Sequence, residues 1–187
     1  MNNLVKITEA EFNIKLDLRY ASTNNVCDIK LYSTPACYLH PTAAEALLRA
    51  IKIAAEKNLR FKIFDGFRPI KVQQFMFDKF PDDSENGGFI SNPKTGSTPH
   101  CRGAAVDLTL IDSKDNELEM GSDFDEFSDL AFHNCERISE TAKKNRRLLF
   151  DIMKEAGWDF YSKEWWHYQL FSAREFAVIQ DNFLSAI

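Results

Sequence analysis

The sequence predicts an α+β fold in a single domain. Apolar residues recur at helical spacing in a few segments, and short apolar runs typical of β-strands lie between them. The chain has 187 residues, about the length of one domain, and neither an internal repeat nor a linker divides it. Hydrophobic residues make up 44% and charged residues 27%, as in ordinary globular proteins. We therefore expect one compact unit.

The N-terminal part begins with short apolar runs separated by turn residues, which favours strands and loops over residues 1–40. A helix is predicted over about 42–58, because Pro41 is a start signal and apolar residues then recur at helical spacing. The run FKIFD predicts a strand over 61–65. A second helix is expected from Pro69 to about residue 79, since proline suits a first helical turn.

A polar loop rich in Gly and Pro follows over 81–99, and loops of that length in compact domains are usually functional or disordered. AAVDLTLID predicts a strand over 104–112, with its Val and Leu residues on one face and its polar residues on the other. After a second, acidic loop we expect a helix over about 136–156 that Gly157 ends. EWWHYQL predicts a strand over 164–170, and SAREFAVIQDNF a terminal helix.

The charge balance bears on the class of partner. Lys and Arg number 23 against 28 Asp and Glu, so the net charge is −5. This acidity disfavours nucleic acid and anionic membrane surfaces as partners, whereas a small zwitterionic substrate stays compatible with it.

The sequence also predicts a cytoplasmic protein, unless an export signal has been removed from it. The N-terminus lacks the pattern of a signal peptide, and no apolar run of 18 residues occurs. The four cysteines show no C-x-x-C spacing, so we expect reduced, mostly buried thiols.

The stretch STPHCRGAAVDLTL carries candidate chemistry. Gly103 can adopt backbone conformations closed to other residues, so the chain can turn sharply and bring His100 beside Asp107. A carboxylate on a strand rich in Val and Leu needs a partner. That partner is either a metal ion or an arginine. Cys101 is expected to be incidental to such a site.

His167 adds a third potential ligand. It lies in an aromatic strand, where a neutral imidazole is usually ligated or hydrogen-bonded. Together with His100 and Asp107 it gives the three protein ligands that catalytic zinc commonly has. Glu164 is then a candidate base for a metal-activated water, or else a solvated residue beside Lys163. Residues i and i+3 of a regular strand face opposite sides, so Glu164 must lie at the strand's start or in a bulge to reach the site.

Arg68, in DGFRP, lies between a predicted strand and a predicted helix, where side chains often project into clefts. Its rigid fork suits a carboxylate or a developing oxyanion. A surface salt bridge is the alternative.

These motifs carry a family resemblance. DGFRP, HCRGAAVDLTL, MGSDFDEF and EWWHYQL occur in that order, after DLRYAST and LYSTPACYLH. Together, over about residues 16–170, they closely resemble the zinc D-alanyl-D-alanine dipeptidases of the vancomycin-resistance type. That family is related to zinc D,D-carboxypeptidases and the hedgehog fold. The expected architecture is a single zinc-peptidase domain over 1–187 with a central, mainly antiparallel sheet and packed helices.

The resemblance also implies a site. It places one zinc ion per chain on His100, Asp107 and His167, makes Glu164 the catalytic base, and makes Arg68 the residue that stabilises the transition state.

The implied substrate is a small dipeptide, D-alanyl-D-alanine, hydrolysed to free D-alanine. Asp125 and Tyr20 match the positions that hold its ammonium group. Thr98 stands where the family has a serine, and it is the candidate for the substrate carboxylate. Two alternatives stay open: a D,D- or L,D-carboxypeptidase that acts on longer peptidoglycan peptides, and a non-catalytic, zinc-stabilised binding module.

Overall fold

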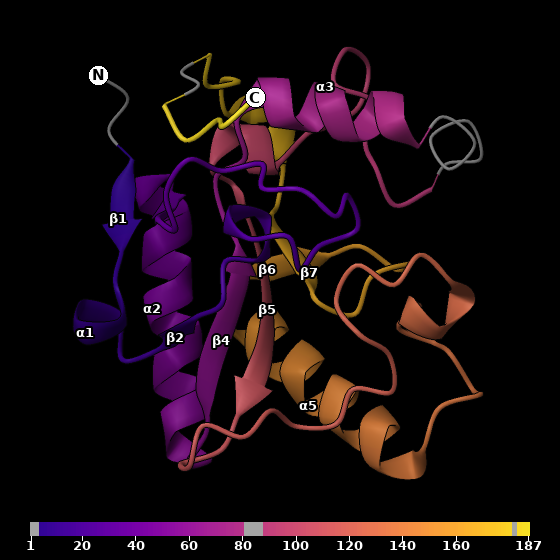
Figure 1. Ribbon diagram of the computed structural model, residues 1–187. Helices are drawn as coiled ribbons and strands as arrows, with labels where there is room; N and C mark the ends of the chain where they lie inside the picture. The colour runs from indigo at the N-terminus through magenta and orange to yellow at the C-terminus, as the bar shows by residue number, and fades with distance from the viewer. Residues whose placement is uncertain (1–3, 81–87, 181–182) are drawn as a thin grey trace.

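A five-stranded sheet forms the centre of the computed structural model, which describes residues 4–80, 88–180 and 183–187 (Figure 1). Its strand order is β2-β4-β5-β7-β6. The strands are β2 (Lys15–Leu16), β4 (Arg60–Asp65), β5 (Ala105–Ile111), β6 (Trp158–Phe160) and β7 (His167–Leu170). Only the pair β2–β4 in this sheet is parallel, while the other three pairs are antiparallel. The predicted α+β fold with a mainly antiparallel sheet is confirmed.

Two long helices, α2 (Pro41–Glu56) and α5 (Glu140–Glu155), pack against the sheet and against each other, α2 on β4 and α5 on β6. A third helix, α3 (Ile70–Lys79), follows β4 and lies at one end of the molecule (Figure 1). Helix α5 begins later than the predicted residue 136, because the Ser139 side chain caps it by accepting from the Ala142 N–H. It ends as expected before Gly157, which has φ +92°.

The N-terminal part contains a short antiparallel pair, β1 (Val5–Ile7) with β3 (Cys37–Leu39). It also contains a one-turn helix, α1 (Glu9–Phe12), in a region where we expected only strands and loops. The Thr8 oxygen accepts from the Glu11 N–H, and its hydroxyl donates to the Glu11 carboxylate. Thr8 thus satisfies one of the free N–H groups at the start of this short helix. Strand β6 was also not predicted.

The predicted terminal helix over 172–183 is wrong. Only a 3-10 turn, Ala173–Glu175, forms, and the chain then runs without regular structure through residue 180. The Ile179 N–H donates to the Cys101 carbonyl at 2.9 Å, and the Phe176 ring packs edge-on against His40 at 4.7 Å. These contacts with distant residues stabilise a non-helical backbone in this segment, and they override its local helical pattern.

The core is apolar and continuous through the sheet. All seven residues of β5 are buried, so the face that carries its polar residues is enclosed rather than solvated. The four cysteines are free thiols. The predicted loop 81–99 lies partly outside the described residues, and its described part, 88–99, holds neither helix nor strand.

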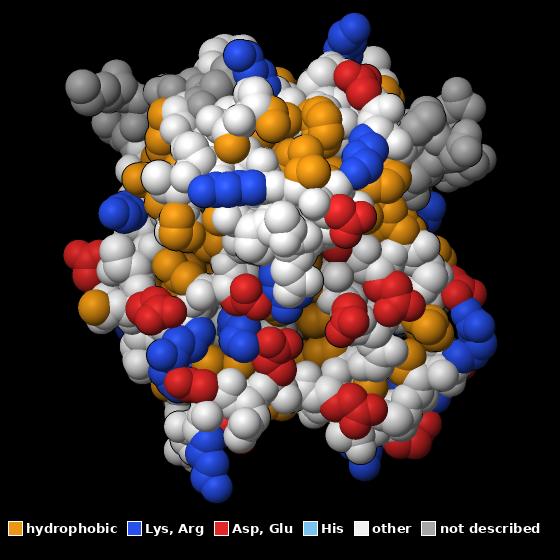
Figure 2. Space-filling view, in the orientation of Figure 1, with side chains coloured by type: hydrophobic (Ala, Val, Ile, Leu, Met, Phe, Trp, Pro, Cys, Tyr) orange, Lys and Arg blue, Asp and Glu red, His pale blue; other side chains and the backbone are white. Residues whose placement is uncertain are grey.

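On the face drawn in Figure 2, acidic and basic side chains are interspersed, and hydrophobic side chains reach the surface in several separate places. Among the residues that the structure describes, no helix combines the length and the apolar character needed to cross a bilayer.

Candidate active site

Strand register places the acidic and imidazole groups side by side. Asp107 on β5 is directly opposite His167 on β7. An irregularity in β4 between Ile63 and Asp65 brings Asp65, rather than Phe64, opposite Asp107. A β-bulge of this kind re-aims the side chains that follow it. Three polar residues from three neighbouring strands therefore meet on one face of the sheet.

His100 reaches the same place from a tight turn. It begins a 3-10 turn that Gly103 ends at φ +64°, and the Gly103 N–H donates to the His100 carbonyl. A Cβ on Gly103 would lie 2.8 Å from the His40 nitrogen, so both conformation and space require glycine here. The turn predicted from the sequence brings His100 Nε2 within 3.2 Å of Asp107 Oδ1.

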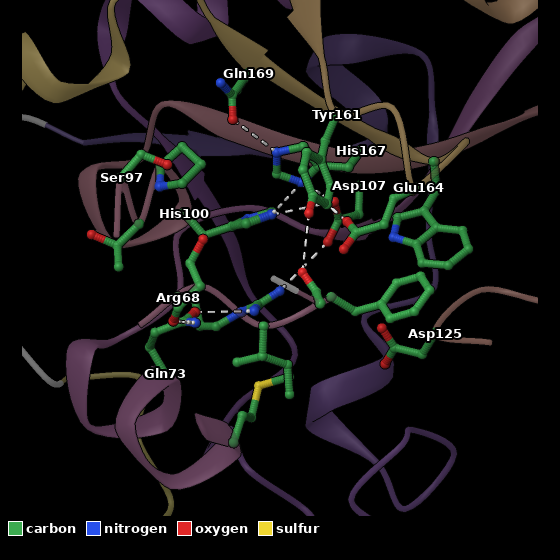
Figure 3. Close-up of a pocket in the computed structure, with 18 of the residues that line it drawn as sticks. Arg68, Gln73, Ser97, His100, Asp107, Asp125, Tyr161, Glu164, His167 and Gln169 are labelled. Atoms are coloured by element: carbon green, nitrogen blue, oxygen red, sulfur yellow. Dashed lines mark hydrogen bonds and ion pairs between the residues drawn. The ribbon is translucent and has the colours of Figure 1, made fainter. Parts of the chain in front are cut away.

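Three potential ligand atoms form a small triangle. His167 Nδ1 lies 3.0 Å from Asp107 Oδ1 and 3.1 Å from His100 Nε2. The remaining ring nitrogens are engaged elsewhere, His100 Nδ1 with the Gly66 carbonyl at 2.7 Å and His167 Nε2 with the Gln169 side-chain oxygen at 3.2 Å. Figure 3 shows these groups gathered on one side of the pocket.

This arrangement fits a metal ion. Because the outer nitrogens donate to carbonyl oxygens, the inner nitrogens present lone pairs toward a carboxylate, which is unfavourable without a cation between them. Ligands of a tetrahedral zinc ion, at about 2.0–2.1 Å, lie roughly 3.3 Å apart, close to the edges of this triangle. His100, Asp107 and His167 form the metal-competent group among the described residues, and the neighbouring Cys101 thiol is not part of it. Burial raises the pKa of Cys101 to about 12.

Glu164 lies next to this group. It precedes β7, in a turn, because the strand begins at His167 and not at residue 164 as predicted. The turn removes the difficulty that residues i and i+3 of a strand face opposite sides, and Glu164 Oε2 lies 3.8 Å from His167 Nδ1. The residue is 7% exposed. Burial raises its carboxyl pKa to about 8, with His167 opposing and Asp107 adding to the shift.

Arg68 is held rigidly at the cavity wall. Its Nε donates to Asp65 Oδ2 at 3.0 Å and its Nη1 to the Gln73 side-chain oxygen at 3.1 Å. Its Nη2 lies 3.5 Å from Asp107 Oδ2, and its guanidinium carbon lies 4.9 Å from the centre of the Tyr20 ring. The guanidinium is thus buried and partnered, rather than forming a surface salt bridge.

Asp125 and Tyr20 lie together in another part of the cavity. The Tyr20 hydroxyl donates to Asp125 Oδ1 at 3.0 Å. Asp125 Oδ2 is buried and has no hydrogen-bond partner among the described residues. Burial raises the pKa of Asp125 to about 7, although the nearby Arg68 opposes the shift. A buried carboxylate oxygen of this kind is suited to a cationic or protonated ligand.

All of the predicted site residues line one cavity of about 180 Å³: Tyr20, Arg68, Thr98, His100, Asp107, Asp125, Glu164 and His167. Two of these, Thr98 with φ +43° and Asp125 with φ +61°, have left-handed backbones. For a β-branched residue such as Thr98 this conformation is a true outlier. Strain of this kind concentrates at functional sites.

Sequence reasoning missed several residues of this cavity. Gln73, Tyr161 and Gln169 line it, and Asp65 lies behind Arg68. Gln169 could have been found, since it is two residues after His167 and so on the same strand face. Asp65 stands inside the DGFRP motif, where a buried acid beside an arginine was a visible signal. Gln73 and Tyr161 left no comparable signal.

Comparison with known proteins identifies the family of the chain. A family model described as Peptidase M15, D-Ala-D-Ala dipeptidase, matches residues 1–186. The D-alanyl-D-alanine dipeptidase of Escherichia coli (strain K12) is 33% identical over 91% of this chain and 86% of its own. That of Enterococcus faecium is 31% identical, over 88% and 89%. A solved structure of the vancomycin-resistance D,D-pentapeptidase VanY with Zn(II) aligns at a TM-score of 0.44 and 16% identity, covering 76% of this chain and 78% of its own. This chain belongs to the D-Ala-D-Ala dipeptidase family of M15 peptidases.

Proposed function

We propose that this protein is a zinc-dependent hydrolase that cleaves D-alanyl-D-alanine to free D-alanine, with one zinc ion held by His100, Asp107 and His167. Family membership supports the reaction, and the triangle of acceptor atoms supports the metal. We also propose that residues 1–187 form one zinc-peptidase domain, since Tyr20 and His167, from opposite ends of the chain, line the same cavity. When held by these three residues, a zinc ion would supply Lewis-acid chemistry and would lower the pKa of water toward neutrality.

The protein's own residues handle the protons and charges. Glu164 accepts a proton as the water oxygen bonds to the carbonyl carbon, and it donates that proton to the leaving nitrogen as the C–N bond breaks. A buried carboxyl group with a raised pKa suits both halves of this exchange. Arg68 donates to the oxygen on which negative charge develops, and its partners fix it in place beforehand.

The observation that carries the choice of a dipeptide is the unpartnered oxygen of Asp125. A free substrate ammonium would give this buried oxygen the charge-assisted hydrogen bond that the described part of the protein does not supply. Tyr20 holds the other carboxylate oxygen in position. We propose that Thr98, which lines the cavity, receives the substrate carboxylate, and its position two residues before His100 supports this role.

The test is release of free D-alanine from D-Ala-D-Ala, compared with a pentapeptide that ends in D-Ala-D-Ala. We expect cleavage of the dipeptide and little cleavage of the pentapeptide. Preferential cleavage of the pentapeptide would instead indicate a carboxypeptidase. Zinc binding without release of D-alanine from either peptide would indicate a binding module.

A further inference from the structure

Gln73 on α3 connects the cavity wall to Arg68. The residue is 3% exposed. Its oxygen accepts from Arg68 Nη1 at 3.1 Å, and its nitrogen donates to the Ser91 carbonyl at 2.8 Å. Arginine can only donate and a carbonyl can only accept, so both partners require the same orientation of the amide. An amide satisfies both contacts at once, whereas a carboxylate or an apolar side chain of similar length does not.

The Ser91 carbonyl belongs to the wall segment, which we define as residues 88–91. All four of its residues line the cavity. The Tyr161 hydroxyl donates to the Gly88 carbonyl at 3.1 Å, and the Phe89 ring stacks on Phe127 with centroids 4.8 Å apart. The wall segment is thus fastened to the rest of the cavity on one side and to Gln73 on the other.

The two edges of the Arg68 guanidinium are held differently. Asp65, which is fully buried at the end of β4, binds Nε and Nη2 at 3.0 and 2.9 Å. The Tyr32 hydroxyl fixes Asp65 in turn by donating to its other oxygen at 2.6 Å. This edge does not depend on the wall segment. The Nη1 edge depends on Gln73, whose orientation depends on the position of the wall segment.

We propose that Gln73 is a positioning residue that couples the wall segment to Arg68. When the wall segment is seated, the Gln73 oxygen faces Arg68 and completes the alignment of the guanidinium. When it is displaced, Gln73 loses one of its two anchors and Arg68 loses support on one edge. A substrate that fits beneath the wall segment therefore reacts with a well-aligned Arg68, whereas one that displaces the wall segment does not. The first substrate should be cleaved with the higher kcat.

Two substitutions separate the contacts of Gln73. Gln73→Met removes both, and we expect kcat for D-Ala-D-Ala to fall roughly 10- to 100-fold, the scale of a small misplacement of a reacting group. Gln73→Glu cannot donate to Ser91, but its carboxylate pairs with Arg68 by charge and so supports that edge of the guanidinium without the wall segment. KM should therefore rise while kcat stays within about threefold. The matched control is Gln74→Met on the same helix, whose amide donates to the Asp78 side chain at the surface. It should leave both constants unchanged.

A double-mutant cycle with Arg68→Ala tests whether Gln73 acts through the arginine. The inference rests on the proposed function, so wild-type protein must first release D-alanine from the dipeptide. If it does not, the proposed function fails on its own. In the Arg68→Ala background we expect Gln73→Met to change kcat less than about twofold, because two members of one unit are non-additive. Zinc content and the folded fraction are measured alongside. An equal kcat loss with and without Arg68, or a kcat loss in Gln73→Glu as large as in Gln73→Met, would overturn the inference.

Discussion

Two parts of the cavity differ in how fully protein groups satisfy their polar atoms. We call them the metal corner (His100, Asp107 and His167) and the amine corner (Tyr20 and Asp125). In the metal corner the three inner atoms lie 3.0–3.2 Å apart and both outer ring nitrogens have acceptors. In the amine corner one buried carboxylate oxygen has no partner among the described residues. Protein groups thus set the metal corner's geometry in advance, while a ligand must complete the amine corner. The first should govern whether chemistry occurs, and the second which substrate is chosen.

The largest expected effect comes from breaking the metal corner. Changing His100, Asp107 or His167 to Ala should remove zinc and reduce D-Ala release below detection, because too few of the three ligands remain. Zinc per chain is measured by elemental analysis. Asp151→Ala, at a surface ion pair with Arg147, is the control and should keep its zinc. Undiminished zinc in all three variants would contradict the assignment.

Glu164→Gln tests the chemistry beside an intact metal corner. The amide has the same size but cannot accept the proton, so kcat should fall about 10²- to 10⁴-fold. Zinc content should stay at the wild-type level, because Glu164 is not among the proposed ligands. The exposed Glu155→Gln serves as control. Turnover close to that of the wild type would mean that another group is the base.

Asp125→Asn breaks the amine corner alone. The free dipeptide should lose kcat/KM. N-acetyl-D-Ala-D-Ala, which we expect to be a very poor substrate of the wild type, should change little, so the ratio of the two kcat/KM values narrows by about tenfold or more. Sites that must pair a buried polar group can discriminate by about 10⁴–10⁵. Asp123→Asn, two residues before it in the same loop and exposed, should leave the ratio unchanged. Equal kcat/KM for the two substrates in the wild type would contradict the proposal that Asp125 binds the substrate ammonium.

The smallest expected effect comes from Tyr20, and it separates the contribution of Tyr20 from that of Asp125 within the amine corner. Tyr20→Phe removes the hydroxyl that donates to Asp125 but keeps the ring beneath Arg68. A single hydrogen bond contributes about 0.5–1.5 kcal/mol net, so kcat/KM for the free dipeptide should fall about 2- to 10-fold. Steady-state kinetics at constant zinc content measures this. A loss as large as that of Asp125→Asn would mean that Tyr20 itself holds the ammonium.

Much of the metal corner was predictable because its signals are local and rare. The chain has four histidines, and Gly103 and Asp107 follow one of them within seven residues. The sequence could not show that a bulge brings Asp65 rather than Phe64 opposite Asp107, because that depends on how β4 pairs with β5. For the same reason it could not show which residues hold Arg68.

The errors in secondary structure have the same origin. The segment 172–183 has a reasonable helical pattern, yet contacts with Cys101 and His40 override it. The aromatic run around Glu164 favours a strand, whereas a turn before β7 is what brings this residue to the site. Local propensity described the long helices well and failed where distant partners decide the backbone.

The left-handed backbones of Thr98 and Asp125 have a consequence for protein engineering. Glycine would relieve a conformational cost of about 1–3 kcal/mol at each position, partly offset by its greater freedom in the unfolded chain. A library selected only for thermal tolerance should therefore accept glycine at both positions. The same library selected for growth on D-Ala-D-Ala should reject glycine at both positions, because Asp125 is the proposed partner of the substrate ammonium and Thr98 that of its carboxylate. Positions where glycine survives the stability selection but not the activity selection would identify residues that bind the substrate, without a structure of the complex.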